Sequence, residues 1–448
     1  MKYQNVVLLL SIFILTGCEK FLSEKPDQKL VIPKTLDDYQ SILEISRVTE
    51  YDPISWERCT DNYFITDASW LSLTSEYDRR AYTWSKELLF ERGNNNEWGY
   101  LYDNIYRANI VIHGLDNYKE DRTVSQYAQL KGDAYFVRGR SFFNGLQIWA
   151  KAYDATTAAT DLGIPLRLDA DINKPTVRAS VKEGYERVLS DLKTAAEHLV
   201  THPLHVVRPS LPAAYALIAR TYLAMRMYDS VYRYTNLGLQ YKAELLDFNS
   251  ITNPNATYPV APFNVEVVYH SFMTSAVILG ASRARIDTTL YKLYDENDWR
   301  KVVYCRPQGD GYFSFRGNYT GHAGAFSGIA TSELYLMRAE ANARIGNVTA
   351  AMDDINKLMA KRWKTGTWIN KTAATKEEAL AVVLTERRKE LIMRGLRWMD
   401  IKRLNKEGYN ISLKRIIQGV EHVLPPNDSR YALPIPEDVI EMTGIQQN

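Results

Sequence analysis

The fold of this chain is decided by two stretches of the same layout, ALIARTYLAMRMYDSVYRY (residues 216–234) and LMRAEANARIGNVTAAMDD (residues 336–354). Each stretch reads as a helix, a short turn and a second helix, because its apolar residues recur at spacings of three and four. Small residues fill the first helix of each stretch, and small side chains let two helices approach closely. The repeat therefore predicts a mainly α fold built from helix pairs.

Helical spacing extends over most of the chain outside these two stretches. Helix pairs of this pattern are similar to tetratricopeptide repeats, which stack into a solenoid. Two regions, near 51–96 and 241–328, show no sustained helical period. We expect a tetratricopeptide-like helical solenoid with long irregular loop insertions and minor β structure. Further predicted helices follow residues 98–115, Tyr127–Trp149, Val181–Leu199 and Lys376–Arg394, the last stopped by Gly395.

The composition is that of a soluble globular protein, with 46% hydrophobic and 24% charged residues in 448. Its long apolar run, Val6–Leu15, is far shorter than the roughly 20 residues that a membrane-spanning helix needs. The net charge of +2 gives no argument for a nucleic-acid partner. The sequence also lacks a phosphate-binding Gly-Lys-Ser/Thr loop, a His-Glu-x-x-His motif and a Gly-x-Ser-x-Gly motif.

The N-terminus has the layout of a secretory signal peptide, with Lys2, the apolar run 6–15 and small residues at the cut. Cys18 follows Leu-Thr-Gly, an arrangement that resembles a bacterial lipobox. This predicts a signal peptide over 1–17, lipid attachment at Cys18 and an anchor and tether over 18–33. A lipid would hold at the membrane a chain that has no spanning helix. The alternative is a plain secreted protein with a chance cysteine.

Aromatic residues are abundant, with 30 Tyr, 9 Trp and 13 Phe, and many lie in the irregular regions. Tyr and Trp join a flat apolar face to a polar group, which suits sugar and peptide binding as well as packing between helices. We take Trp56, Trp70, Tyr312 and Tyr319 as candidate ligand-binding residues. For each of them, packing in the core is an equally weighted alternative.

The charged segment near the C-terminus reads as structural. Glu386 and Glu390 share one helix face, and arginines surround them. Asp400 is expected to accept from Arg397 or Arg403. A glycosidase pair would need one acid with a raised pKa, whereas neighbouring arginines lower the pKa of a carboxyl group.

Two further patterns are weak. His198, His202 and His205 have the spacing of a zinc-binding helix face, but Pro203 interrupts the helix and no acid or cysteine completes the set. A solvated helix end is the favoured interpretation. Cys59 and Cys305 are either a disulfide or two buried thiols. We predict no metal and no cofactor.

The segment ERRKELIMRGLRWMDIKR (386–403) closely resembles the hallmark of the SusD/RagB family of outer-membrane nutrient-binding lipoproteins. Other blocks agree, in the family's order and over nearly the whole chain. One departure is the stretch Trp149–Leu162, which is longer than expected. The agreeing blocks are CEKFL (18–22), RGRSFF (138–143), Pro212–Leu223, ELYLMRAEA (333–341), LPIP (433–436) and the terminal Gln447-Asn448.

The resemblance implies one SusD-like unit over 34–448 that captures an extracellular nutrient, most often an oligosaccharide, without catalysis. It implies a SusC-like TonB-dependent transporter as partner, and a lipid-anchored location in the outer membrane facing the cell exterior. Ligand residues are not carried over, because the matching blocks are scaffold. Two alternatives stay open: a peptide-binding member of the family, and a tetratricopeptide-type interaction scaffold without a small ligand.

Overall fold

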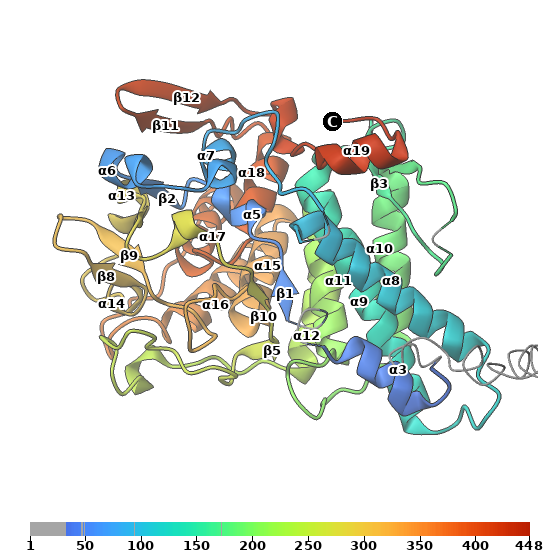
Figure 1. Cartoon of the computed structure of the whole chain (residues 1–448). Helices are drawn as coiled ribbons and strands as arrows, with labels where there is room; N and C mark the ends of the chain where they lie inside the picture. Colours follow the sequence, from blue (N-terminus) through green and yellow to red (C-terminus); the bar gives the residue numbers. More distant parts are fainter. Residues whose placement is uncertain (1–32, 46–47, 49, 94, 172) are drawn as a thin grey trace, which may run out of the picture.

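The computed structural model describes residues 33–45, 48, 50–93, 95–171 and 173–448, and it is mainly helical, as expected (Figure 1). The predicted signal peptide (1–17), the lipid site at Cys18 and nearly all of the tether (18–33) lie outside the described residues. Across those ranges, no helix combines the length and the apolar character that crossing a membrane requires.

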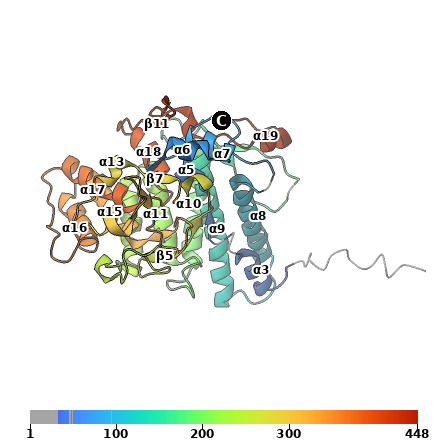
Figure 2. The same ribbon diagram turned by 60° about the vertical axis from the view of Figure 1, so that its left-hand side comes forward.

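The long helices pack on one another in chain order. Each helix from α8 to α12 packs on the next, α15 joins α12, and α16 and α17 pack on α15. Figure 2 shows α8 and α9 on the side of the molecule away from α15, α16 and α17. The helices are α8 (Glu97–Asp116), α9 (Ser125–Trp149), α10 (Val181–His198), α11 (Leu211–Met225), α12 (Tyr228–Tyr241), α15 (Thr331–Arg344), α16 (Val348–Met359) and α17 (Lys376–Glu390).

Small residues bring these helices close together. A Cβ atom on Gly184 of α10 would lie 2.8 Å from the side chain of Leu146 in α9, and one on Gly238 of α12 would lie 2.8 Å from Leu334 in α15. The alanines of α11 are fully buried. The predicted pairs α11–α12 and α15–α16 are therefore confirmed as close-packed helix pairs. Their stacking as a tetratricopeptide-type array stays a prediction.

The predicted end of the last long helix is wrong by four residues. Helix α17 ends at Glu390 instead of Arg394, and Met393 and Gly395 take positive φ values of 56° and 70°. The chain turns at Met393 and Gly395, and the side chains of Ile392 and Met393 pack in the hydrophobic core of the loop region. Gly395 is required there, because a Cβ atom would lie 2.5 Å from the indole of Trp56.

The two carboxylates of α17 belong to a buried ion network, as the sequence indicated. Glu386 accepts from Arg300 at 2.6 Å, and Glu390 accepts from Arg362 at 2.8 Å and from Arg300 at 3.2 Å. Burial would raise the pKa of Glu390, but Arg362 and Arg300 bring that pKa below its usual value. Glu390 therefore stays ionised, and the ion pairs of both acids hold α17 against the loop region.

The sequence predicts that Asp400 accepts from Arg397 or Arg403, and the contact with Arg403 is confirmed. Asp400 accepts from Arg387 at 2.8 Å and from Arg403 at 2.9 Å. Arg397 turns instead to Asp61, 2.7 Å away, because Asp61 comes from the loop region packed on this turn. The hallmark segment therefore fastens the two regions together through α18 (Arg397–Asn405).

Short strands and short helices form the irregular region. The strands pair as β1 (Tyr51–Asp52) with β6 (Phe272–Met273), β2 (Tyr63–Ile65) with β7 (Ala284–Ile286), β3 (Leu162–Pro165) with β4 (Arg178–Ser180), β5 (Val267–Tyr269) with β10 (Ile329–Ala330), β8 (Cys305–Pro307) with β9 (Phe313–Phe315), and β11 (Leu413–Ile417) with β12 (Val420–Leu424). The short helices are α3 (Leu36–Leu43), α5 (Ser55–Arg58), α6 (Asp67–Leu71), α7 (Glu76–Tyr82), α13 (Thr288–Tyr291), α14 (Arg300–Val303) and α19 (Glu437–Thr443), with single 3₁₀ turns at Phe248–Ser250, Val277–Leu279 and Ser429–Tyr431. One hydrophobic cluster, which includes Tyr63, Tyr294 and Tyr319, lies within the loop region, whereas other loop residues such as Trp56 and Trp84 pack in the same cluster as the long helices.

Candidate functional site

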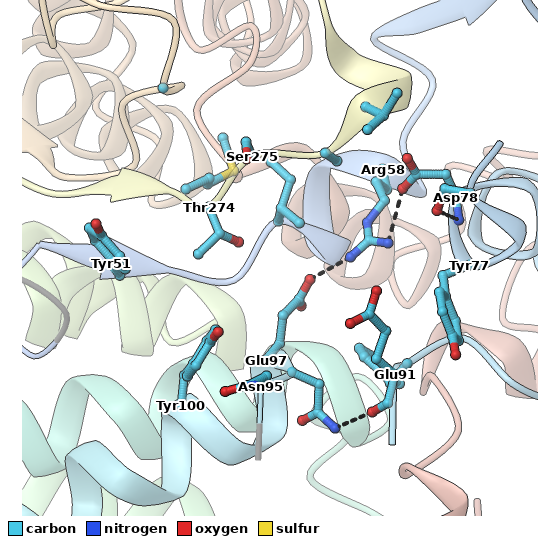
Figure 3. Close-up of a pocket in the computed structure, with 18 of the residues that line it drawn as sticks. Tyr51, Arg58, Tyr77, Asp78, Glu91, Asn95, Glu97, Tyr100, Thr274 and Ser275 are labelled. Carbon is cyan, nitrogen blue, oxygen red and sulfur yellow. Dashed lines mark hydrogen bonds and ion pairs between the residues drawn. The ribbon is translucent and has the colours of Figure 1, made fainter. Parts of the chain in front are cut away.

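A cavity of about 640 Å³ opens between the loop region and the start of α8. Segments that lie far apart in the sequence line it, and Figure 3 shows most of these residues. The parallel pairing of β1 with β6 places Tyr51 directly beside Phe272. The lining residues lie within 51–58, 75–78, 89–91, 95–100 and 272–277, with His322 and Gly324 completing the lining.

Three tyrosines face this cavity from opposite walls. Figure 3 shows Tyr77 on one side, and Tyr51 and Tyr100 on the other. All three are half-buried, so part of each ring stays accessible. The ring of Tyr51 packs at 5.0 Å on Phe272, which packs at 4.9 Å on His322. This packing holds one wall in place and leaves flat aromatic surface toward the cavity.

A buried arginine ties the walls together. Arg58 of α5 donates to Asp78 of α7 at 3.1 Å and to Glu97 of α8 at 2.7 Å (Figure 3). Burial would lower the pKa of Arg58, but Glu97 and Asp78 raise it overall. Asp78 also accepts from the backbone N–H of Ile278, and Glu97 from the N–H and hydroxyl of Ser55. The cavity is therefore a preorganised feature with a rigid floor.

Other polar groups around the cavity remain available to a ligand. Glu91 and Asn95 are exposed, and Figure 3 shows the Glu91 carboxylate pointing inward. Among the described residues, the Glu91 carboxylate has no hydrogen-bond or ion-pair partner, whereas its backbone carbonyl accepts from Asn96. Thr274 and Ser275 add hydroxyl groups to the opposite wall. Aromatic faces beside amide, hydroxyl and carboxylate groups form the kind of lining that holds a polyhydroxylated ligand.

A second pocket borders the cavity at the segment 274–276. This pocket of about 200 Å³ shares Ile54, Gly324 and this segment with the first, and it is lined further by Tyr258, Arg316 and Asn318. The main cavity alone lies within the 300–1,000 Å³ range typical of small-molecule sites.

The structure places two of the four predicted ligand residues in the core, so their expected exposure is wrong. Trp56 is 4% exposed, because it packs under Gly395 in the turn after α17. Tyr319 is 0% exposed, because its hydroxyl donates to the buried Glu266 at 2.9 Å and Arg394 lies over its ring. Neither ring has a face to offer a ligand.

The other two predicted residues lie at the surface, outside the cavity. Trp70 is half-buried on α6 and has the guanidinium of Arg79 over its ring. Tyr312 is 39% exposed and packs edge-on against Phe64 at 5.0 Å. Neither residue lines the 640 Å³ cavity.

Sequence reasoning missed the tyrosines that line the cavity. Tyr100 carries a usable signal, since it falls outside the apolar stripe of Trp98, Leu101 and Ile105 on the same helix. Tyr51 and Tyr77 carry no such signal, because their placement depends on the β1–β6 pairing and on the Arg58 network. The spacing of residues within one segment does not reveal which other segment of the chain it will contact.

The structure also places the cysteines and histidines that the sequence singled out. Cys59 and Cys305 are both buried free thiols, so the disulfide alternative is wrong. His198 ends α10, and no group of three His, Cys, Asp or Glu side chains in the described part of the chain is placed to hold a metal ion.

The fold and the cavity define a helical protein with a loop-built ligand site, and family comparisons agree. Residues 20–223 match a SusD-like family described as "Starch-binding associating with outer membrane", and residues 317–448 match the SusD family. The chain belongs to the SusD/RagB family. No curated protein matches it.

Solved structures show the same fold at low sequence identity. A SusD superfamily protein from Bacteroides thetaiotaomicron is 21% identical, with a TM-score of 0.74 over 92% of this chain and 99% of the other. A putative sugar binding protein from Bacteroides vulgatus is 20% identical, with a TM-score of 0.73 over 93% and 99%. A laminarin binding SusD-like protein is 17% identical, with a TM-score of 0.64 over 92% and 97%.

Proposed function

We propose that this protein captures an extracellular oligosaccharide without catalysis and passes it to a TonB-dependent outer-membrane transporter. One observation carries the ligand part of the proposal: a 640 Å³ cavity with Tyr51, Tyr77 and Tyr100 on facing walls. Flat rings bind the faces of sugar rings with little loss of side-chain entropy, since an aromatic side chain has two χ angles to fix. The family match and the sugar-binding relatives support this choice of ligand.

The lack of catalysis is argued from the carboxylates. Glu386 and Glu390 are buried and ion-paired, away from any accessible surface. At the cavity, Glu97 is held by Arg58 and Ser55. A glycosidase needs one carboxyl group kept protonated and free to reach the scissile bond. Because Glu386, Glu390 and Glu97 are held by these partners, none of them is free to act as the general acid, which favours binding over hydrolysis.

The partner and the location follow from the family. We propose a signal peptide over 1–17, lipid attachment at Cys18, a tether over 18–33 and one functional unit over 34–448 facing the cell exterior. Within that unit the helices α8 to α17 would stack as a tetratricopeptide-like array and give the transporter a large docking surface. Cys18→Ala should release the protein from membranes, and retention of labelled fatty acid in that variant would contradict the assignment.

The peptide-binding alternative is favoured by one feature, the carboxylate and amide groups near the cavity, which suit a peptide backbone as well as sugar hydroxyls. The scaffold alternative would need a surface without a ligand site, and the cavity argues against it. Both alternatives are tested by the same panel of ligands.

The proposal is tested by isothermal titration of the protein lacking residues 1–17 with neutral, amine-bearing and acidic oligosaccharides and with short peptides. At least one oligosaccharide should bind with a micromolar to millimolar Kd, about 4–8 kcal/mol. Tyr77→Ala should weaken that binding about tenfold or more, because it removes one aromatic face. Tyr232→Ala, at an exposed tyrosine of α12, is the control and should change nothing. If peptides bind and oligosaccharides do not, the protein would be a peptide-binding member of the family. If neither oligosaccharides nor peptides bind, the proposed function is overturned.

A further inference from the structure

The charges lining the cavity are unbalanced. Asp78, Glu91 and Glu97 bring three carboxylates, and Arg58 is the sole Lys or Arg among the lining residues that the structure describes. Arg58 is already engaged by Asp78 and Glu97. Arg92, next to Glu91 in the chain, turns away and pairs with Glu441 at 2.7 Å. The surplus negative charge therefore falls on Glu91.

Glu91 is placed where a bound ligand would meet it. Its carboxylate points into the cavity, which Tyr77 also lines (Figure 3). Across the described residues it has no ion-pair partner, which distinguishes it from Asp78 and Glu97. An unpaired carboxylate beside aromatic faces suits an ammonium group, because the carboxylate supplies a charge-assisted hydrogen bond and the ring face attracts a cation.

Resting on the proposed function, we infer that the cavity takes amine-bearing oligosaccharides in preference to neutral or acidic ones, with Glu91 as the partner of the ligand's ammonium group. A carboxylate or sulfate on the ligand would face Glu91 with like charge and would find Arg58 occupied. A neutral hydroxyl would donate a hydrogen bond to Glu91 that lacks the attraction between opposite charges. The order of affinity is amine-bearing, then neutral, then acidic.

The test compares glycans of matched backbone by isothermal titration at about pH 6, where a primary amine is protonated. Each backbone in the panel is offered with a free amine, with the amine acetylated, with a hydroxyl at that position, and as the uronic acid. The free-amine form should bind about five- to tenfold more tightly than its acetylated and hydroxyl counterparts. The uronic acid should bind most weakly.

Variants assign the preference to one residue. Glu91→Gln should remove the advantage of the free-amine form over the hydroxyl form. Glu87→Gln removes the same charge from an exposed residue of the same loop that does not line the cavity, and it should leave the ranking unchanged. Equal loss in both variants would show a diffuse field effect and overturn the assignment to Glu91.

The outcomes separate this inference from the proposed function. If neutral or acidic glycans bind most tightly, or if Glu91→Gln leaves the ranking intact, the charge preference is wrong while oligosaccharide capture stands. If amine-bearing peptides bind and amine-bearing glycans do not, the preference belongs to a peptide ligand and the inference fails. If no glycan binds at all, the proposed function itself fails.

Discussion

The helices α8 to α17 and the loop-built cavity depend on different kinds of contact between residues of the chain. In the helices, each apolar position follows from its neighbours three and four residues away, and buried alanines and glycines set the distances between helices. In the cavity, the lining comes from segments near 51, 77, 91 and 272, joined by one strand pairing and one arginine. The scaffold is specified locally, whereas the site is specified by long-range contacts.

The two regions also differ in how completely their charged side chains are paired. In the scaffold, every carboxylate of the α17 network meets an arginine or lysine: Glu386 and Glu390 pair with Arg300, and Glu390 also with Arg362. Among the residues that the structure describes at the cavity, Asp78 and Glu97 are paired but Glu91 is not. The paired charges fix the geometry of the cavity, and the proposed role of the unpaired one is in recognition. Substitutions in the two regions should therefore separate stability from binding.

The largest effect is expected in the buried network. Arg362→Met leaves Glu266 and Glu390 buried without this partner, and should lower the free energy of unfolding by about 3–5 kcal/mol. Urea denaturation followed by circular dichroism measures this change. Lys361→Met is the matched control, because Lys361 forms an exposed ion pair with Asp247 and should change stability by less than about 1 kcal/mol. Equal effects of the two variants would contradict the scaffold role of the network.

The next effect concerns the turn after α17, where the hallmark segment meets the loop region. Gly395→Ala should lower the free energy of unfolding by about 2–4 kcal/mol, for two reasons. An alanine is strained at the φ of 70° that this position takes, and its Cβ would lie 2.5 Å from the indole of Trp56. Gly366→Ala has a similar φ of 77° and open space around it, so it should cost only about 1 kcal/mol. The difference between the two melting temperatures measures the contact with Trp56. Equal losses would mean that the close approach is relieved at no cost.

Trp56 and this turn also show what the sequence could and could not predict. The long helices follow from periodicity, and the family from the segment 386–403. The burial of Trp56 depends on Gly395, more than 300 residues away, and that of Tyr319 on Glu266. Composition predicted aromatic residues in the loops, but it could not say which rings face inward. The hairpin β11–β12 was also missed, since its turn at Gln418 and Gly419 lacks the Asn-Gly or Asp-Gly signal.

The free energy of unfolding should depend on pH through the buried side chain of His270. Burial, with smaller contributions from His322 and His205, lowers the pKa of His270 from 6.5 to about 4. Glu50, whose pKa burial raises, lies 3.6 Å from its ring. Between about pH 6.5 and 4 the unfolded chain binds the extra proton and the folded chain does not, so the stability contributed by neutral His270 is lost as pH falls through this window.

The measurement is the difference between the wild type and His270→Gln, taken by urea denaturation at several pH values. The difference isolates His270 from Glu57 and Asp133, whose pKa values are raised to about 7 by burial and which act in the opposite sense. The stability of the wild type relative to the variant should fall by about 1–3 kcal/mol from pH 6.5 to 4. A constant difference across this window would show that His270 does not titrate with folding.

The smallest effect is expected at Trp70 and Tyr312, the predicted ligand residues that lie on the surface outside the cavity. Trp70 is half-buried under Arg79, and Tyr312 contacts Phe64 by its edge, so each ring adds little to the core. Trp70→Ala and Tyr312→Ala should each lower the free energy of unfolding by about 1 kcal/mol or less.

If ligand extends from the cavity onto this surface, each variant should weaken binding of long oligosaccharides by about two- to threefold and leave binding of short ones unchanged. Isothermal titration with a length series of one glycan measures this, with Tyr77→Ala as the variant that weakens all lengths. A loss of affinity in the surface variants equal to that in Tyr77→Ala would move the ligand site from the cavity to the surface, and would overturn the division between a locally specified scaffold and a site built by long-range contacts.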